Sequence, residues 1–368
     1  MKASSRHSAG DWVEVRSKEE ILKTLDAKGQ LDSLPFMPEM FNHCGRRFRV
    51  FKRAHKTCDT VNKTGGRKML NTVHLDGVRC DGKAHGGCQA GCLVFWKDDW
   101  LKSVPEPSSP VAISPSQELR EVDGQASGCR EEDVWAATNV RATENAAGPI
   151  YVCQATQVPA ATEPLPWWNT RQYIEDFASG NVALEQMARG FIYMGYRGLI
   201  NSGIGLGRPL RWFYDRFQRL RGGVPYPRKR GRIPAGKRTP SGELNLQSGE
   251  WVRVKSYEEI LATLDSNNRN RGLYFDAEMV PYCGRSFRVL TRVNKILDEK
   301  TGKMTEFKKP CIILEGVACE SRYSECRLFC PRRIYSYWRE IWLERVSPPE
   351  NRLRSVKGSD IRREQFTN

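Results

Sequence analysis

The sequence contains one module twice, and this duplication limits the folds that the chain can adopt. GDWVEVRSKEEILKTLD, which begins at Gly10, aligns almost continuously with GEWVRVKSYEEILATLD, which begins at Gly249. The match resumes at PFMPEMFNHCGRRFRV against YFDAEMVPYCGRSFRV, continues at LDGVRC against LEGVAC, and ends at WKDDWLKSV against WREIWLERV. Because similar repeats fold alike, we expect two modules of one architecture, at about 10–105 and 249–347.

Each copy predicts a small β structure with one short helix. Ser17 and Glu20 have the spacing of a capping box, which predicts the start of a helix. WVEV before this helix alternates as a strand does, and Phe48 and Val50 share one face of a later strand. These patterns favour a mainly β fold with α segments (α+β), in which each copy is a small SH3-like barrel.

The residues outside the two copies divide by composition. The segment 106–165 is rich in Pro, Ser, Ala and Glu, so we expect a flexible linker. The segment 166–222 has apolar residues at helical spacing, which predicts a helical hairpin docked on the modules. An amphipathic helix lying on a membrane surface is the alternative for this segment. We expect a basic linker at 223–248 and a polar tail at 348–368.

The duplication separates the cysteines into two sets. Four positions recur in both copies, namely Cys44 with Cys283, Cys80 with Cys319, Cys88 with Cys326, and Cys92 with Cys330. Four thiols close a tetrahedral metal site, so we predict these eight cysteines as metal ligands. No secretory signal and no apolar run long enough to span a membrane is visible in the sequence. We therefore expect a cytoplasmic chain with reduced thiols.

Zinc is the metal that four thiolates favour, and we predict one ion in each module, with an iron–sulfur cluster as the alternative. The stretch CDGKAHGGCQAGC contains three of the recurring thiols, with glycines that let the backbone wrap around an ion. Its spacing differs from the doubled CxxC of zinc ribbons. Buried thiols without a metal, and disulfides, therefore stay open as further interpretations.

The stretch CDGKAHGGCQAGCLVFWKDDWL, with PFMPEMFNHCGRRFRV before it, resembles a group of uncharacterised bacterial proteins that carry this block once or twice. The resemblance covers both copies and not the segment between them. It implies the module boundaries and brings no activity with it, so the function has to be inferred from the residues.

All five histidines lie in the first quarter of the chain, so any acid–base or nucleophilic chemistry belongs to the first copy. His55, His85 and Cys58 are available for such chemistry. We favour a simpler interpretation, in which His43 and His85 are neighbours of metal thiolates. Turn or cap roles are predicted for two recurring acids, Glu39 with Glu278 and Asp59 with Asp298. The catalytic residues, and whether the chain is an enzyme, stay open.

The net charge of +16 predicts attraction to phosphates, acidic membranes or acidic partners. Basic and aromatic residues alternate as they do in barrels that bind single-stranded nucleic acid. The predicted polyanion-binding residues are Arg46, Arg47, Arg49, Phe51, Lys52, Arg53, Arg285 and Arg288. We therefore predict a metal-bearing, duplicated binding or scaffold protein with a basic face for nucleic acid, another polyanion or an acidic protein. The alternatives are an iron–sulfur redox protein or a subunit of a biosynthetic enzyme, with peripheral membrane contact through 166–222 left open.

Overall fold

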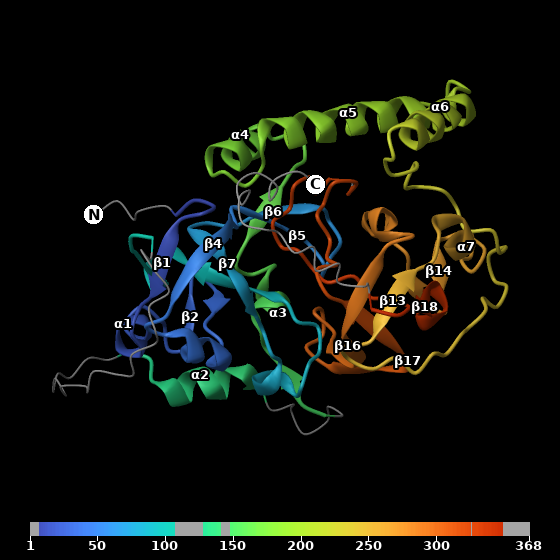
Figure 1. Cartoon of the computed structure of the whole chain (residues 1–368). Coiled ribbons are helices and arrows are strands. Elements are labelled where there is room, and N and C mark those ends of the chain that lie inside the picture. Colours follow the sequence, from blue (N-terminus) through green and yellow to red (C-terminus); the bar gives the residue numbers. More distant parts are fainter. Residues whose placement is uncertain (1–6, 107–127, 141–147, 325, 349–368) are drawn as a thin grey trace, which may run out of the picture.

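The chain folds into two barrel-like modules that lie side by side (Figure 1). The computed structural model describes residues 7–106, 128–140, 148–324 and 326–348. The architecture is mixed α/β, with mostly strands and some helices. The first module, in blue, lies beside the second, in orange and red, and a layer of three helices lies across one side of both.

A curled five-stranded sheet with the order β8-β7-β4-β1-β9 forms the first module. The strands are β1 (Trp12–Val15), β4 (Arg47–Arg53), β7 (Thr72–Arg79), β8 (Leu93–Lys97) and β9 (Leu101–Ser103). Shorter elements are α1 (Lys18–Leu22), β2 (Gln30–Leu31), β3 (Leu34–Pro35) and the 3-10 helices η1 (Pro38–His43), η2 (Lys83–His85) and η3 (Asp98–Trp100). Ser17 and Glu20 form the predicted capping box of α1. Trp96 and Trp100 fill the core between the strands and α1.

The second module repeats this arrangement with the sheet order β17-β16-β13-β18. Its elements are β13 (Trp251–Val254), α7 (Tyr257–Leu261), β14 (Arg269–Asn270), β15 (Leu273–Tyr274), η4 (Ala277–Tyr282), β16 (Ser286–Leu297), β17 (Met304–Leu314), η5 (Glu340–Trp342) and β18 (Leu343–Arg345). The registers correspond, because Trp12 pairs with Arg49 in the first module and Trp251 pairs with Arg288 in the second.

Each module extends a hairpin onto the cysteine loop of the other. We name residues 80–92 the first cysteine loop and residues 319–330 the second. The hairpin of β5 (Lys56–Cys58) and β6 (Gly66–Lys68) reaches the second loop, where Lys56 Nζ donates to the carbonyl of Leu328 at 2.8 Å. The far end of β16 reaches the first loop, where the Leu297 N–H donates to Cys88 Sγ at 3.2 Å. The two copies are thus joined through the segments that carry their cysteines.

Part of the segment expected to be a flexible linker is ordered structure, which corrects that prediction for 128–140 and 148–165. It forms α2 (Glu131–Thr138), β10 (Asn139–Val140), β11 (Ile150–Tyr151), α3 (Gln154–Gln157) and β12 (Glu163–Leu165). Val134 and Val158 are buried in the first core, and β12 pairs with β6. A few apolar anchors order a segment whose average composition is polar. Residues 107–127 and 141–147 of this prediction lie outside the described residues.

The central segment forms three helices, α4 (Arg171–Ala178), α5 (Leu184–Asn201) and α6 (Gly207–Leu220). Asp176 on α4 is buried and accepts hydrogen bonds from Lys56, at 2.5 Å, which fixes α4 to the β5–β6 hairpin. Tyr193 and Ile200 on α5 pack beneath the helix with Tyr226. Within the described part of the chain, no helix has both the length and the apolar character to cross a membrane. Residues 349–368, nearly all of the predicted tail, lie outside the described residues.

Candidate metal centre

The first cysteine loop brings three metal-ligand side chains to one place. Glu39 lies on η1, Cys80 follows β7, and His85 ends η2. Tight turns bend this loop, since Gly82 has φ of +70° and a Cβ there would lie 1.9 Å from the Cys88 carbonyl oxygen. Only glycine fits such a position, so the glycines of CDGKAHGGC are needed to fold the loop.

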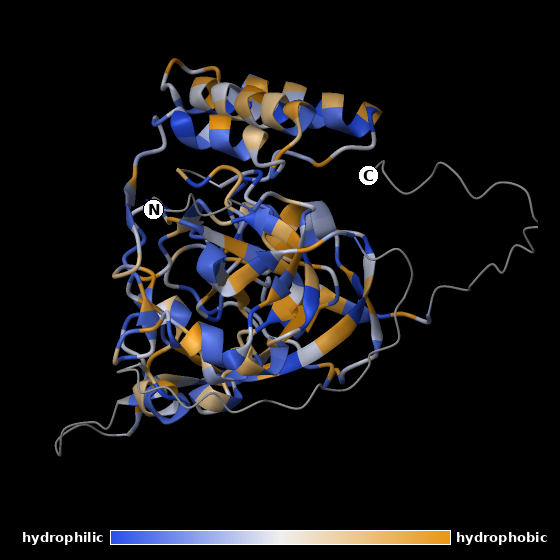
Figure 2. Cartoon of the chain, turned by 90° about the vertical axis from the view of Figure 1, so that its left-hand side faces the viewer, coloured by the Kyte–Doolittle hydropathy of each residue, from blue (hydrophilic) through white to orange (hydrophobic). Residues whose placement is uncertain are grey.

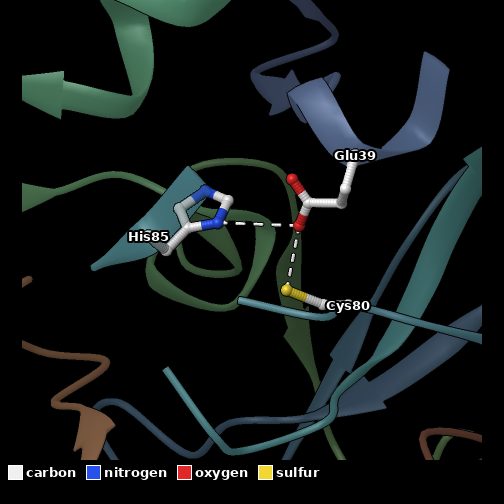
Figure 3. A group of neighbouring side chains, drawn as sticks. All are labelled: Glu39, Cys80 and His85. Carbon is white, nitrogen blue, oxygen red and sulfur yellow. Dashed lines mark hydrogen bonds and ion pairs between the residues drawn. The ribbon is translucent and has the colours of Figure 1, made fainter. Parts of the chain in front are cut away.

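Figure 3 shows how the three side chains converge. Cys80 Sγ donates to Glu39 Oε1 at 2.9 Å, and His85 Nδ1 lies 3.6 Å from the same oxygen. One ligand atom of each residue lies within 4.8 Å of the other two. No other group of three histidine, cysteine or acidic residues meets that distance within the described ranges. The three side chains therefore form one compact candidate centre.

Two buried ligand atoms in this centre lack a hydrogen-bond partner. His85 Nε2 lies 3.1 Å from the Val152 carbonyl oxygen, which can only accept, so Nε2 carries the proton. His85 Nδ1 therefore presents a lone pair toward Glu39 and Cys80, and neither Nδ1 nor Glu39 Oε2 has a hydrogen-bond partner. Buried polar atoms are ordinarily paired, so these two atoms point to a missing partner.

Burial keeps the thiol and the imidazole of the centre uncharged. Burial, together with the neighbouring Glu39 carboxylate, holds the pKa of the Cys80 thiol far above its ordinary value. Burial lowers the pKa of His85, which keeps the imidazole neutral. A metal ion would reverse the effect on Cys80, because a cation stabilises a thiolate.

A pocket adjoins the three residues. Besides Cys80 and His85, its walls contain Cys88, Cys92 and Cys153. Burial raises the pKa of Cys92 to about 12 and that of Cys153 to about 11. The second module closes the pocket with Leu297, Glu299 and Arg332. The pocket thus lies at the junction of the two modules and is lined largely by sulfur and apolar groups.

In the second module the equivalent carboxylate, Glu278, has hydrogen-bond partners for both oxygens. Glu278 on η4 accepts hydrogen bonds from the N–H groups of Arg322 and Tyr323 and from Ser324 Oγ, at 3.1 Å in the last case. Ser324 follows Cys319 by five residues, as His85 follows Cys80. Serine thus stands where the first copy has histidine, and the loop itself satisfies Glu278.

The predicted four-thiol sites are only partly assembled. Cys80, Cys88 and Cys92 line one pocket, but Cys44 lies apart from it, near Lys18 and packed on the first core. In the second copy Cys283 packs on the second core, Cys326 is exposed and Cys330 is buried. Cys319 and Cys58 line a second pocket. Four-thiolate centres in the two modules therefore stay predictions.

Cys58, which does not recur, lies against the second cysteine loop. The neighbouring Cys330 thiol and the charge of Arg332 lower the pKa of Cys58 below its ordinary value. Arg332 also donates to the Cys58 carbonyl oxygen at 3.3 Å. Cys58 therefore belongs to the contact between the modules rather than to the centre at His85.

The predicted polyanion residues divide into exposed and internal groups. The exposed ones are Arg46, Arg47, Arg49, Arg285 and Arg288. Arg53 is buried and pairs with Asp98 and Glu175, so it does not belong to an exposed basic face. Lys52 is largely buried, which lowers its pKa, and Phe51 lies between Lys52 and Arg333.

The remaining candidates have structural roles. Asp59 accepts from the Asn62 N–H at 2.8 Å, and Asp298 accepts from the Thr301 N–H at 2.8 Å, so both acids hold hairpin turns as predicted. His55 is buried against Asp176, with 3.2 Å between His55 Nε2 and a carboxylate oxygen. His43 packs edge-on against Phe48 at a ring distance of 5.4 Å.

The sequence predicts a turn or cap role for Glu39 and a place beside metal thiolates for His85, and no spacing pattern in it joins the two residues. Their link had one visible signal, since Glu39 recurs as Glu278 whereas His85 does not recur. Neither the family models nor the curated proteins contain a match to this chain, so the interpretation of the site depends on its geometry.

Proposed function

We propose that the first module binds one zinc ion through Glu39, Cys80 and His85, and that the chain performs metal-centred chemistry in the adjoining pocket. The observation that carries this proposal is the pair of buried atoms, His85 Nδ1 and Glu39 Oε2, that lack hydrogen-bond partners beside a thiol. This observation favours a protein with chemistry in its first module over a protein that serves only as a scaffold.

The donor set and the surrounding residues suit zinc. Thiolate, imidazole and carboxylate are the three ligand types of protein zinc sites, and the edges of a zinc tetrahedron are roughly 3.3–3.8 Å. The contacts of 2.9 and 3.6 Å at Glu39 Oε1 are near those edges. A metal-binding histidine ordinarily donates its second ring N–H to a carbonyl or carboxylate. The Val152 carbonyl takes that role for His85.

Three protein ligands leave a fourth position for water or a substrate atom. Zinc in such a site lowers the pKa of bound water to about 7 and polarises carbonyl or phosphoryl oxygens. The fourth position would face the pocket that Cys88, Cys92 and Cys153 line. The pocket has a volume of about 40 Å³, which suits a water molecule or another ligand of a few atoms beside the metal.

Metal analysis of the purified full chain tests the proposal. We expect about one zinc per chain, and Cys80→Ser should remove it because one of three ligands is lost. Cys319→Ser is the matched control, since it changes the equivalent thiol of the second copy, and it should retain the zinc. Two zinc ions per chain, or a brown protein with iron and sulfide, would contradict the proposal.

Cobalt substitution tests whether the fourth position is open. Co²⁺ in place of zinc should give a visible spectrum that shifts when a small thiol or azide is added, because the added ligand enters the open position. A spectrum that does not respond to either ligand would mean that a fourth side chain closes the site. The centre would then be structural.

Polyanion binding is the second candidate function. Arg46 and Arg285 each lie over a phenylalanine ring, at 5.5 Å in both copies, and Arg49 and Arg288 are exposed on equivalent strands. We propose that each module is an SH3-like barrel. One basic strand on each of two such barrels suits an extended polyanion. Binding of oligonucleotide at near-physiological salt is the test.

A further inference from the structure

Exposed apolar side chains gather on the helical layer. Of the seventeen large apolar residues that are exposed in the described part of the chain, fourteen lie between residues 167 and 220. They are Trp167, Trp168, Ile174, Phe177, Leu184, Phe191, Ile192, Leu199, Ile204, Leu206, Trp212, Phe213, Phe217 and Leu220. A soluble monomer rarely exposes so many such residues in one region, so this surface marks an interaction site.

The apolar residues form stripes on the side of the helices away from the modules. On α5 the exposed residues Leu184, Ile192 and Leu199 recur at helical spacing, and the opposite side packs inward. Phe191 lies at the border of this stripe, since its ring also contacts Phe329 at 6.2 Å. On α6, Phe213, Phe217 and Leu220 repeat the pattern. The layer forms the upper edge of the molecule in Figures 1 and 2, and orange segments recur along its helices in Figure 2.

The inner side of the layer is firmly attached. Gly190 on α5 packs directly on the ring of Phe329, since a Cβ at Gly190 would lie 2.5 Å from that ring. Asp215 on α6 pairs with Lys229 at 2.9 Å and accepts from the Tyr226 N–H at 2.7 Å. Because the inner side is occupied, the helices cannot rotate their apolar stripes into the protein.

Positive charge borders the apolar stripes. The stretch from Leu184 to Arg221 carries seven arginines and two acids. Both acids have partners, Glu185 with Arg189 and Asp215 with Lys229. In contrast, Arg208, Arg216 and Arg219 are exposed and have no carboxylate partner among the described residues. The layer therefore combines exposed tryptophan and phenylalanine with uncompensated arginine.

We propose that α5 and α6 lie flat on an anionic lipid bilayer. A helix with Trp, Phe and Leu on one side and basic residues beside them binds in the plane of the interface, and its arginines attract acidic headgroups. Trp212, 61% exposed, has the amphipathic ring that is enriched at the level of the headgroups. Charge complementarity distinguishes this occupant from a second copy of the chain, whose helical layer would present the same arginines.

Flotation of the full chain with lipid vesicles tests the proposal. We expect binding to vesicles of phosphatidylcholine with phosphatidylserine, and at least about tenfold weaker binding to phosphatidylcholine alone, because several arginines each contribute about fivefold. Phe217→Asp should weaken binding by about 10–100-fold, since burial of a phenylalanine side chain is lost. Leu70→Asp is the matched control, because Leu70 is 51% exposed on the first module and adds the same charge when changed.

Several outcomes would overturn the proposal. These are no binding to either vesicle, equal binding to both, or equal losses for Phe217→Asp and Leu70→Asp. A dimer in sedimentation that Phe217→Asp dissociates, with no vesicle binding, would identify a second copy as the occupant. Unchanged zinc content and near-ultraviolet circular dichroism in Phe217→Asp would show that the variant folds, so that a loss of vesicle binding is specific.

Discussion

The two cysteine loops have similar sequences, but the buried carboxylate beside each loop is hydrogen-bonded differently. At the first loop, Glu39 on η1 accepts a hydrogen bond from the Cys80 thiol and faces His85, and one of its oxygens has no hydrogen-bond partner. In the second loop Glu278 receives three hydrogen bonds from the loop itself. A buried carboxylate has to be compensated. The second copy does this with two backbone N–H groups and the Ser324 hydroxyl, whereas the first leaves ligand atoms that a metal ion can use.

Each module extends a hairpin onto the cysteine loop of the other, an arrangement that we call the hairpin exchange. It gives each loop a different neighbour. Leu297 of the second module seals the pocket of the first loop with an apolar side chain. Cys58 of the first module, which aligns with Leu297, brings a thiol to Cys330 in the second loop. The two copies therefore share one scaffold and differ in the groups that surround their cysteine loops. We expect metal binding at the first loop and a reactive thiol, that of Cys58, beside the second loop.

Exchange of His85 and Ser324, which each lie five positions after the first cysteine of their loop, should have the largest effect on zinc binding. His85→Ser gives the first copy the residue of the second and should weaken zinc binding at least about 100-fold, because even indirect partners of metal ligands contribute 10–100-fold. Ser324→His should add no second zinc, since Glu278 is already satisfied. Competition with a chromophoric chelator measures both. A second zinc in Ser324→His would show that the loops differ by this residue alone.

Removal of the two carboxylates should separate a structural role from a ligand role. Glu278→Ala leaves three donors without their acceptor and should lower the free energy of unfolding by about 3 kcal/mol. Glu39→Ala in the metal-free protein deprives only the Cys80 thiol and should cost about 1 kcal/mol. Urea unfolding of the metal-free variants gives both values. Equal losses would mean that the two carboxylates contribute equally to the stability of the fold.

His74 makes an acid-sensitive contribution to the first module that its counterpart in the second module cannot make. Burial lowers the pKa of His74 to about 4, and the aligned position holds buried Ile313. Below pH 6.5 the unfolded histidine gains a proton that the folded one does not, so stability is lost as the pH falls toward 4. His74→Ile should remove about 2 kcal/mol of this loss at pH 4.5, measured by urea unfolding at several pH values. An unchanged pH profile would exclude this role.

Glycine substitutions test the shape of the first loop. Gly82→Ala places a Cβ against the Cys88 carbonyl, so we expect a loss of about 2 kcal/mol and weaker zinc binding. Gly316→Ala is the matched control, because φ is +72° there and no atom lies within 4 Å of the added Cβ. It should cost about 1 kcal/mol and leave zinc unaffected. Equal effects on zinc would mean that the loop tolerates the added methyl group.

Local patterns predicted what is local in this fold. The capping box at Ser17, the strands around Phe48 and the turn role of Asp59 follow from residues a few positions apart. The central helices followed from apolar spacing in the same way. The candidate centre could not be predicted, because Glu39 and Cys80 are 41 positions apart and His85 had no counterpart to mark it.

Average composition was misleading where a few anchors decide the structure. The segment 148–165 has a linker-like composition, yet Gln154 donates to the Phe95 carbonyl at 2.8 Å and Val158 is buried. Cys153, assigned to that linker, lines the pocket of the first loop. The hairpin exchange had no signal in the sequence, because contacts between two copies leave no periodicity in either one.

The smallest expected effect concerns the equivalent arginines. A polyanion that contacts both modules should lose one phosphate contact with Arg49→Ala and one with Arg288→Ala, and each change should flatten the salt slope by about one unit. Phe51→Ala should weaken binding less than either arginine change, since Phe51 is only partly exposed and its ring already contacts Arg333 and Lys52 at 5.2 and 5.7 Å. Fluorescence anisotropy with a labelled oligonucleotide, titrated at several salt concentrations, measures the slopes. A slope changed by only one arginine would assign binding to that module, and no binding at about 0.15 M salt, where the Debye length is about 8 Å, would exclude the polyanion function.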